Sequence, residues 1–189
     1  MNIHKDVDCV IANENELKNI VNGLAGKLNA RYSYVDGKNS RLLVIGILKG
    51  AFVFLSDLTR KLRIPIQIDF MQTSSYGQSS VSGGDVKLKL DLGSGYDYAK
   101  TDILVVEDII DTGRTFKNLT MNLQNRGAKS VEACALLDKP SRRVTEYTPE
   151  YTGKIIPDVF VVGYGLDFNE RYRELPYVGA LKSSIYTSK

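Results

Sequence analysis

The stretch from Ile103 to Thr115, ILVVEDIIDTGRT, constrains the fold more than any other part of the sequence. Its first four residues are apolar, a run typical of a strand buried on both faces of a parallel sheet. Two acids follow, Glu107 and Asp108, and the small polar residues of 111–115 then lead into a helical pattern. Because the N–H groups that open a helix lack internal partners, this turn predicts an anion site. Acids beside an anion site fit a ligand that carries phosphate, hydroxyls and a divalent cation.

The rest of the chain repeats the alternation of buried strand, loop and helix. Apolar runs predict further strands at 42–48, 64–73 and 131–137, and a last apolar run covers 155–165, after a polar and irregular segment at 141–153. Amphipathic spacing predicts helices at 14–31, at 51–62 and from Phe116 to Gly127. Alternating elements with short loops favour an α/β fold, doubly wound, with a mainly parallel central sheet and helices on both faces.

Polar side chains follow three of these predicted strands. They are Lys49, Glu107, Asp108, Asp111 and Lys139. Because ligands of doubly wound sheets bind beyond the carboxyl ends of the strands, we expect these side chains to share one crevice. Taken singly, Lys49 is also typical of a solvated strand end, and Asp111 of a cap on the following helix.

Residues 74–85 are rich in serine and glycine and separate two alternating segments, 64–73 and 86–92. Two alternating segments around a flexible stretch predict a β-hairpin with a mobile tip. An ordinary surface loop or linker has the same composition. A linker between domains is disfavoured because the flanks read as paired strands, so we expect a single domain over 1–189.

The composition excludes several classes of protein. The net charge of +3 is mild and scattered, so no basic stripe for nucleic acid is evident. The single histidine excludes histidine-based triads and multi-histidine metal sites, and the two cysteines are too few for a disulfide framework. No apolar run is long enough for a membrane helix, and the N-terminus lacks a secretory signal. These features predict a cytoplasmic protein.

The contiguous pattern at 103–115 resembles the phosphoribosyl-diphosphate (PRPP) motif of the type I phosphoribosyltransferases. The resemblance covers nearly all of the chain from about residue 40, and it is strongest to the hypoxanthine-guanine branch of that family. It implies a core at about 37–155 and a small C-terminal hood from about 156–189 that includes the N-terminal segment. It also implies that Ser75, Tyr76 and Gly77 belong to a mobile β-hairpin lid.

The resemblance implies binding roles for the phosphate-carrying end of the site. The 5-phosphate of PRPP would contact Asp111, Thr112, Gly113, Arg114 and Thr115. The ribose hydroxyls would contact Glu107 and Asp108. The pyrophosphate would contact Lys49, Gly50 and Arg173. Relatives often have a cis peptide at the position of Leu48 and Lys49, which the sequence leaves open.

The resemblance also implies roles at the base end. Asp111 would be the catalytic residue and would accept or steer the proton at purine N7. The purine would contact Lys139, Phe160, Val161 and Asp167, with Lys139 donating to O6. A Mg²⁺ cofactor would contact Glu107, Asp108 and Asp167. Without the resemblance, Phe160 is more typical of a core aromatic, and Arg173 is typical of a solvated charge on a helix.

The activity implied is purine salvage. The enzyme would transfer the 5-phosphoribosyl group from PRPP to N9 of hypoxanthine or guanine, giving IMP or GMP and pyrophosphate. It would act on small molecules, as a homodimer or homotetramer, without nucleic acid or membrane partners. One alternative is a xanthine-preferring enzyme, and another is a PRPP-sensing regulator without catalysis. The presence of both Lys139 and Asp111 favours an enzyme.

Overall fold

A computed structural model describes residues 3–73 and 88–187. The strands are β1 (Val7–Ala12), β2 (Arg41–Ile47), β3 (Gln67–Thr73), β4 (Leu88–Leu90), β5 (Thr101–Ile110), β6 (Ser130–Asp138), β7 (Tyr151–Ile155), β8 (Val161–Val162) and β9 (Val178–Leu181). The helices are α1 (Glu14–Arg31), α2 (Phe52–Thr59), α3 (Arg114–Asn125) and α4 (Ser183–Tyr186), with short 3-10 turns η1 (Tyr98–Lys100) and η2 (Pro140–Arg142).

The large sheet has six strands in the order β4-β3-β2-β5-β6-β7. All neighbours from β3 to β7 pair in parallel, and only β4, at the edge, pairs antiparallel with β3. The order places β5, the strand of the PRPP-like motif, in the middle of the sheet. The predicted mainly parallel, doubly wound sheet is confirmed.

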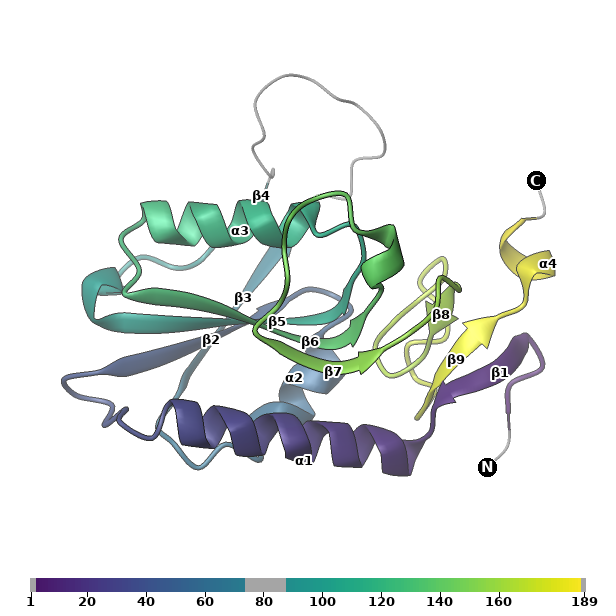
Figure 1. The fold of residues 1–189 in the computed structure, drawn as a ribbon, viewed down its shortest axis with the longest axis horizontal. Helices are drawn as coiled ribbons and strands as arrows, with labels where there is room; N and C mark the ends of the chain where they lie inside the picture. The colour runs from purple at the N-terminus through teal and green to yellow at the C-terminus, as the bar shows by residue number, and fades with distance from the viewer. Residues whose placement is uncertain (1–2, 74–87, 188–189) are drawn as a thin grey trace, which may run out of the picture.

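Helices cover both faces of this sheet: α3 lies on one face, and α1 and α2 lie on the other (Figure 1). Alternate residues of each strand pack against the helices on one face or the other, since successive side chains point to opposite faces of the sheet. Leu42 and Val44 pack in the core under α1 and α2, whereas Leu43 and Ile45 pack in the core under α3. Burial on both faces explains the unbroken apolar runs in the middle of these strands, at 42–45 and 103–106.

A small antiparallel sheet, β1-β9-β8, joins the two ends of the chain. It lies beside the edge of the large sheet at which β7 ends (Figure 1). Its own core is formed by Val7, Val162, Tyr172, Tyr177 and Leu181. The helix that follows β1, α1, packs instead against the large sheet.

Several boundaries differ from the sequence prediction. Helix α2 ends at Thr59, and β3 begins at Gln67, beyond Pro65, which lacks the N–H that a ladder needs. Strand β7 begins at Tyr151, inside the stretch predicted to be irregular. The apolar run at 155–165 is divided between two sheets, because Pro157 interrupts it and β8 pairs with β9. No helix among the described residues is long and apolar enough to cross a membrane.

Candidate active site

A cavity of about 570 Å³ opens where the carboxyl ends of the large sheet meet the hood. Its lining comes from the β2–α2 loop, β5, the β6–β7 connection and the hood. The lining residues predicted from sequence are Lys49, Gly50, Asp108, Asp111, Lys139, Phe160, Val161, Asp167 and Arg173. The structure therefore brings together residues that are up to 124 positions apart, from Lys49 to Arg173.

The two acids of the motif lie within β5 rather than beyond it, since the strand continues to Ile110. Asp108 lines the large cavity. Glu107 lines a smaller cavity of about 170 Å³, together with the turn residues Thr112 and Gly113. The strand thus directs one carboxylate toward each of two adjoining spaces.

The Glu107–Asp108 pair is held without a cation from the described residues. Oε2 of Glu107 is buried and has no hydrogen-bond partner there. Burial and the neighbouring Asp108 charge raise the pKa of Glu107 well above its usual range. Burial also raises the pKa of Asp108 to about 6, although the Ile109 N–H donates to it at 2.6 Å. The Arg173 charge offsets only part of this effect at Asp108, and no lysine or arginine of the described residues forms an ion pair with either acid, which favours a cationic ligand.

Close backbone approach explains the glycine at the turn after β2. A Cβ on Gly50 would lie 1.6 Å from Oδ2 of Asp108, so no side chain fits there. Gly165 of the hood, at φ +103°, packs against the Gly50 carbonyl, and a Cβ on it would lie 2.2 Å from that oxygen. The β2 turn, β5 and the hood therefore meet at van der Waals distance. The Leu48–Lys49 peptide beside them is cis.

The turn before α3 leaves the helix N-terminus without a side-chain cap. The N-cap is Gly113, at φ 80°, and Thr112 Oγ1 accepts only a long 3.5 Å bond from the Arg114 N–H. Asp111 does not cap the helix, so that alternative is wrong. Its Oδ1 accepts a hydrogen bond from Arg142 Nε at 2.6 Å. The N–H groups that open this 12-residue helix are available to an anion.

Lys139 is buried at the other end of the cavity. It follows β6, its side chain is 9% exposed, and its Nζ lies 3.8 Å from Asp158. Burial lowers the pKa of Lys139, an effect that the nearby Asp111 and Asp158 charges oppose. Because its one ion pair within the described residues, to Asp158, is as long as 3.8 Å, this ammonium has N–H donors available for a ligand oxygen.

Lys49 and Arg173, the predicted pyrophosphate contacts, share one carboxylate. Glu170 Oε2 lies 3.0 Å from Lys49 Nζ and 3.2 Å from Arg173 Nη2. Arg173 Nη2 also lies 2.8 Å from Asp167 Oδ1, and its Nη1 donates to the Gly165 carbonyl. The two cations are thus close together and held by hood residues.

Aromatic rings form one wall of the cavity. Phe160 is 37% exposed, which is unusual for a core aromatic. Its ring stacks on Tyr186 of α4, with centroids 5.2 Å apart, and meets Phe168 edge-on at 5.5 Å. Val161, in β8, continues this wall.

Sequence analysis missed four side chains of this site: Arg142, Asp158, Glu170 and Tyr186. Arg142 lies close after the predicted strand at 131–137, so the rule that located Lys139 could have included it, whereas Asp158 follows β7, which the sequence analysis did not predict. Glu170 and Tyr186 reach the site through the hood, and no local pattern marks them. The lid residues Ser75, Tyr76 and Gly77 lie outside the described residues.

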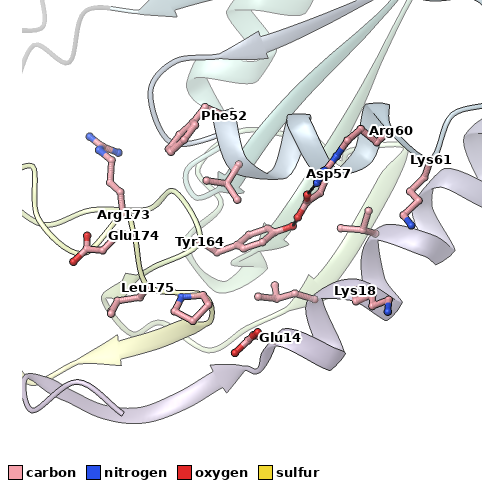
Figure 2. Close-up of a pocket in the computed structure, with 14 residues that line it drawn as sticks. Glu14, Lys18, Phe52, Asp57, Arg60, Lys61, Tyr164, Arg173, Glu174 and Leu175 are labelled. Atoms are coloured by element: carbon pink, nitrogen blue, oxygen red, sulfur yellow. Dashed lines mark hydrogen bonds and ion pairs between the residues drawn. The ribbon is translucent and has the colours of Figure 1, made fainter. Parts of the chain in front are cut away.

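A second cavity, of about 500 Å³, lies between α1, α2 and the hood. Figure 2 shows Tyr164 pointing across it toward Asp57 of α2, and the Tyr164 hydroxyl donates to that carboxylate at 2.6 Å. Its rim combines Phe52 with charged side chains such as Lys18 and Glu174. Arg173 lines both cavities, so it forms part of the wall between them.

No group of three or more histidine, cysteine, aspartate or glutamate side chains within 3–73 and 88–187 could hold a metal ion alone. Magnesium sites often use only one or two carboxylates and complete the shell with substrate phosphates and water. The unpartnered Oε2 of Glu107 beside Asp108 fits a cation of this kind, shared with a phosphorylated ligand.

The chain matches known proteins over almost its whole length. Residues 11–169 match the family model described as "Phosphoribosyl transferase domain". The hypoxanthine-guanine phosphoribosyltransferase of Staphylococcus aureus is 44% identical over 186 residues, which are 98% of this chain and 100% of that protein. The bifunctional protein TilS/HprT of Listeria monocytogenes is also 44% identical, over 98% of this chain, but this chain spans only 28% of its length.

A solved structure agrees with these matches. The crystal structure of a hypoxanthine phosphoribosyltransferase from S. aureus superposes with a TM-score of 0.89, at 43% identity, and each chain is covered completely. Identity of this order over full-length relatives, together with the sheet order and the cavity beyond β5, establishes the family. The chain belongs to the phosphoribosyltransferase family, in its hypoxanthine-guanine branch.

Proposed function

We propose that this protein transfers the 5-phosphoribosyl group from PRPP to N9 of hypoxanthine or guanine, in purine salvage. The observation that carries the proposal is the pairing of Asp111 and Lys139 in one cavity beside the exposed ring of Phe160. A carboxylate, an ammonium and an aromatic face match the N7, O6 and ring plane of a 6-oxopurine. Family membership supports the same activity.

The phosphate-carrying half of the substrate would lie against the β5 turn. Backbone and hydroxyl donors of Thr112, Gly113, Arg114 and Thr115 would hold the 5-phosphate at the N-terminus of α3. Glu107 and Asp108 would accept hydrogen bonds from the ribose hydroxyls. Lys49, the Gly50 backbone and Arg173 would bind the diphosphate, after Lys49 and Arg173 release Glu170.

The base half would lie between the hood and the β6–β7 connection. The purine ring would stack on Phe160, Lys139 would donate to O6, and the Val161 backbone and Asp167 would contact the base edge. The N9 lone pair forms the new bond to the anomeric carbon as the bond to the diphosphate oxygen breaks. The proton that the purine loses would pass to, or be steered by, Asp111 at N7.

A magnesium ion fits this site as a partner of the substrate. Glu107, Asp108 and Asp167 would contact it, directly or through water and ribose hydroxyls. When bound, it would neutralise charge on the departing diphosphate. Its positive charge would also offset the repulsion between the Glu107 and Asp108 carboxylates.

A base screen with PRPP and Mg²⁺ tests the proposal. We expect turnover of hypoxanthine and guanine, and none of adenine or orotate, because a lysine donor suits O6 and is mismatched to a 6-amino group. Adenine turnover equal to that of guanine would contradict this specificity. Xanthine turnover above both would identify the xanthine-preferring alternative, and binding of PRPP without turnover of any base would identify the regulator.

The cellular and oligomeric parts of the proposal need separate measurements. We propose a cytoplasmic enzyme that acts as a homodimer or homotetramer and uses no nucleic-acid partner. Light scattering on the purified protein tests the assembly. Omission of Mg²⁺ from the assay, with a chelator as control, tests the cofactor.

A further inference from the structure

Arg142 connects the two sides of the candidate base site. It ends the short turn η2, between β6 and β7. Its Nε donates to Asp111 Oδ1 at 2.6 Å, and its Nη1 lies 3.2 Å from Asp158 Oδ2. Asp111 belongs to the loop after β5, whereas Asp158 belongs to the segment that leads from β7 to the hood. One guanidinium therefore bridges the phosphate turn and the approach to the hood.

The contact leaves half of the Asp111 carboxylate free. Arg142 contacts Oδ1, and within the described residues no hydrogen bond to Oδ2 occurs. Asp111, Arg142 and Asp158 all line the 570 Å³ cavity. The arrangement holds the carboxylate by one oxygen and leaves the other for a ligand.

We propose that Arg142 is a positioning residue for phosphoribosyl transfer, which orients the Asp111 carboxylate toward purine N7 and is itself anchored by Asp158. This inference rests on the proposed function, because it assigns Asp111 a role at N7. The logic is that of a catalytic base oriented by a third group. A planar guanidinium with two anchoring carboxylates has little freedom to turn, so it restricts the rotation of the Asp111 side chain.

The same contacts make a second behaviour testable. If Arg142 only blocked the empty site, the purine would have to displace it, and its removal would lower KM for the base. If Arg142 instead positions Asp111, its removal should lower kcat, since a misplaced catalytic group slows turnover. The two roles are separated by one substitution.

The experiment measures kcat and KM for hypoxanthine and for PRPP in six proteins. They are the wild type, Arg142→Gln, Arg142→Lys, Asp111→Asn, the double variant Asp111→Asn/Arg142→Gln, and the control Arg126→Gln. Arg126 forms an ion pair with Asp91 at 2.7 Å, away from the cavity. Thermal melting of each variant checks that it folds.

We expect Arg142→Gln to lower kcat about tenfold and leave KM for PRPP unchanged, because the loss is confined to orientation at the base. Arg142→Lys keeps the charge and should recover part of the loss. The double variant should be no slower than Asp111→Asn, because Arg142 acts through Asp111. Arg126→Gln should match the wild type.

Two results would overturn the inference on their own. One is a wild-type kcat in Arg142→Gln, and the other is an additive loss in the double variant. A lower KM for hypoxanthine in Arg142→Gln would replace positioning with blocking. If the wild type turned over no base, the proposed function itself would fail. If the wild type were active and Arg142→Gln had the same kcat, only the positioning role of Arg142 would fail.

Discussion

The ribose end and the base end of the site differ in how their carboxylates are neutralised. At the base end, Asp111 and Asp158 lie 2.6 and 3.2 Å from Arg142, and Lys139 lies 3.8 Å from Asp158. At the ribose end, no lysine or arginine of the described residues forms an ion pair with Glu107 or Asp108. Asp108 at the ribose end and Asp111 at the base end are only three positions apart in the sequence.

This difference indicates what each end requires from its ligand. A purine is nearly neutral, so the protein itself must supply and orient the charges that bind it. A magnesium–diphosphate ligand brings its own cation, so acids at the ribose end are left unpaired until that ligand binds. On the proposed function, the base end is preorganised and the ribose end is completed by substrate.

The largest test of this contrast is Asp111→Asn. The change keeps the size of the side chain and removes most of its basicity, so kcat should fall about a hundredfold or more. PRPP affinity and melting temperature should hardly change, because Asp111 does not cap α3. Near-normal turnover with weakened PRPP binding would instead assign Asp111 to the phosphate end.

Lys139 provides the next largest effect, through pH. The ammonium form donates a charge-assisted hydrogen bond to O6 that the neutral amine cannot match, and burial lowers the pKa of Lys139 below its ordinary 10.5. Deprotonation therefore begins at a lower pH than for a free lysine. We expect kcat/KM for hypoxanthine to fall on the basic side below pH 10.5, about tenfold per unit beyond the midpoint.

A Lys139→Arg variant is the matched control for this dependence of kcat/KM on pH. A guanidinium keeps its proton throughout this range. In the variant, kcat/KM should therefore no longer fall at high pH, even if its overall activity is lower. If kcat/KM of Lys139→Arg fell at the same high pH as in the wild type, another group would control the decrease.

The smallest expected effect is a gain in stability from Glu107→Gln. Groups with a pKa raised by folding contribute stability below their unfolded pKa and lose it as pH rises through the folded value. Folding makes both acids of the pair harder to ionise, so their ionisation near pH 8 costs stability, and Glu107→Gln should raise the melting temperature there by about 2–4 °C. The gain should shrink as pH falls toward 4.5, the ordinary pKa of a glutamate, because Glu107 is then protonated in the unfolded chain as well.

The same variant should bind PRPP and Mg²⁺ more weakly, about tenfold by isothermal calorimetry, since a carboxylate contact is lost. A variant that is more stable without ligand but binds the ligand more weakly indicates that the acid serves ligand binding and not folding. A destabilised Glu107→Gln protein would contradict the contrast between the two ends.

Local sequence predicted the elements that carry the site more reliably than their limits. The apolar runs identified β2, β5 and β6 because the middle of each central strand is buried on both faces, where apolar side chains are favoured. The acids were expected after the strand at 103–106, but β5 continues to Ile110. Parallel pairing with β6, through Ile109 and Ile110, extends the strand, and that pairing is invisible in either segment alone.

The sequence by itself determined the parallel core, the turn at 111–115 and the side of the sheet on which ligands bind, since these follow from short-range patterns. Only the tertiary structure decided which partners the site residues have. Arg142 reaches Asp111 across 31 positions, Glu170 reaches Lys49 across 121, and Tyr186 stacks on Phe160 from the C-terminal helix. Such contacts depend on how separate loops pack together, as where Gly165 of the hood meets Gly50 after β2. The spacing of residues along the chain does not reveal that packing.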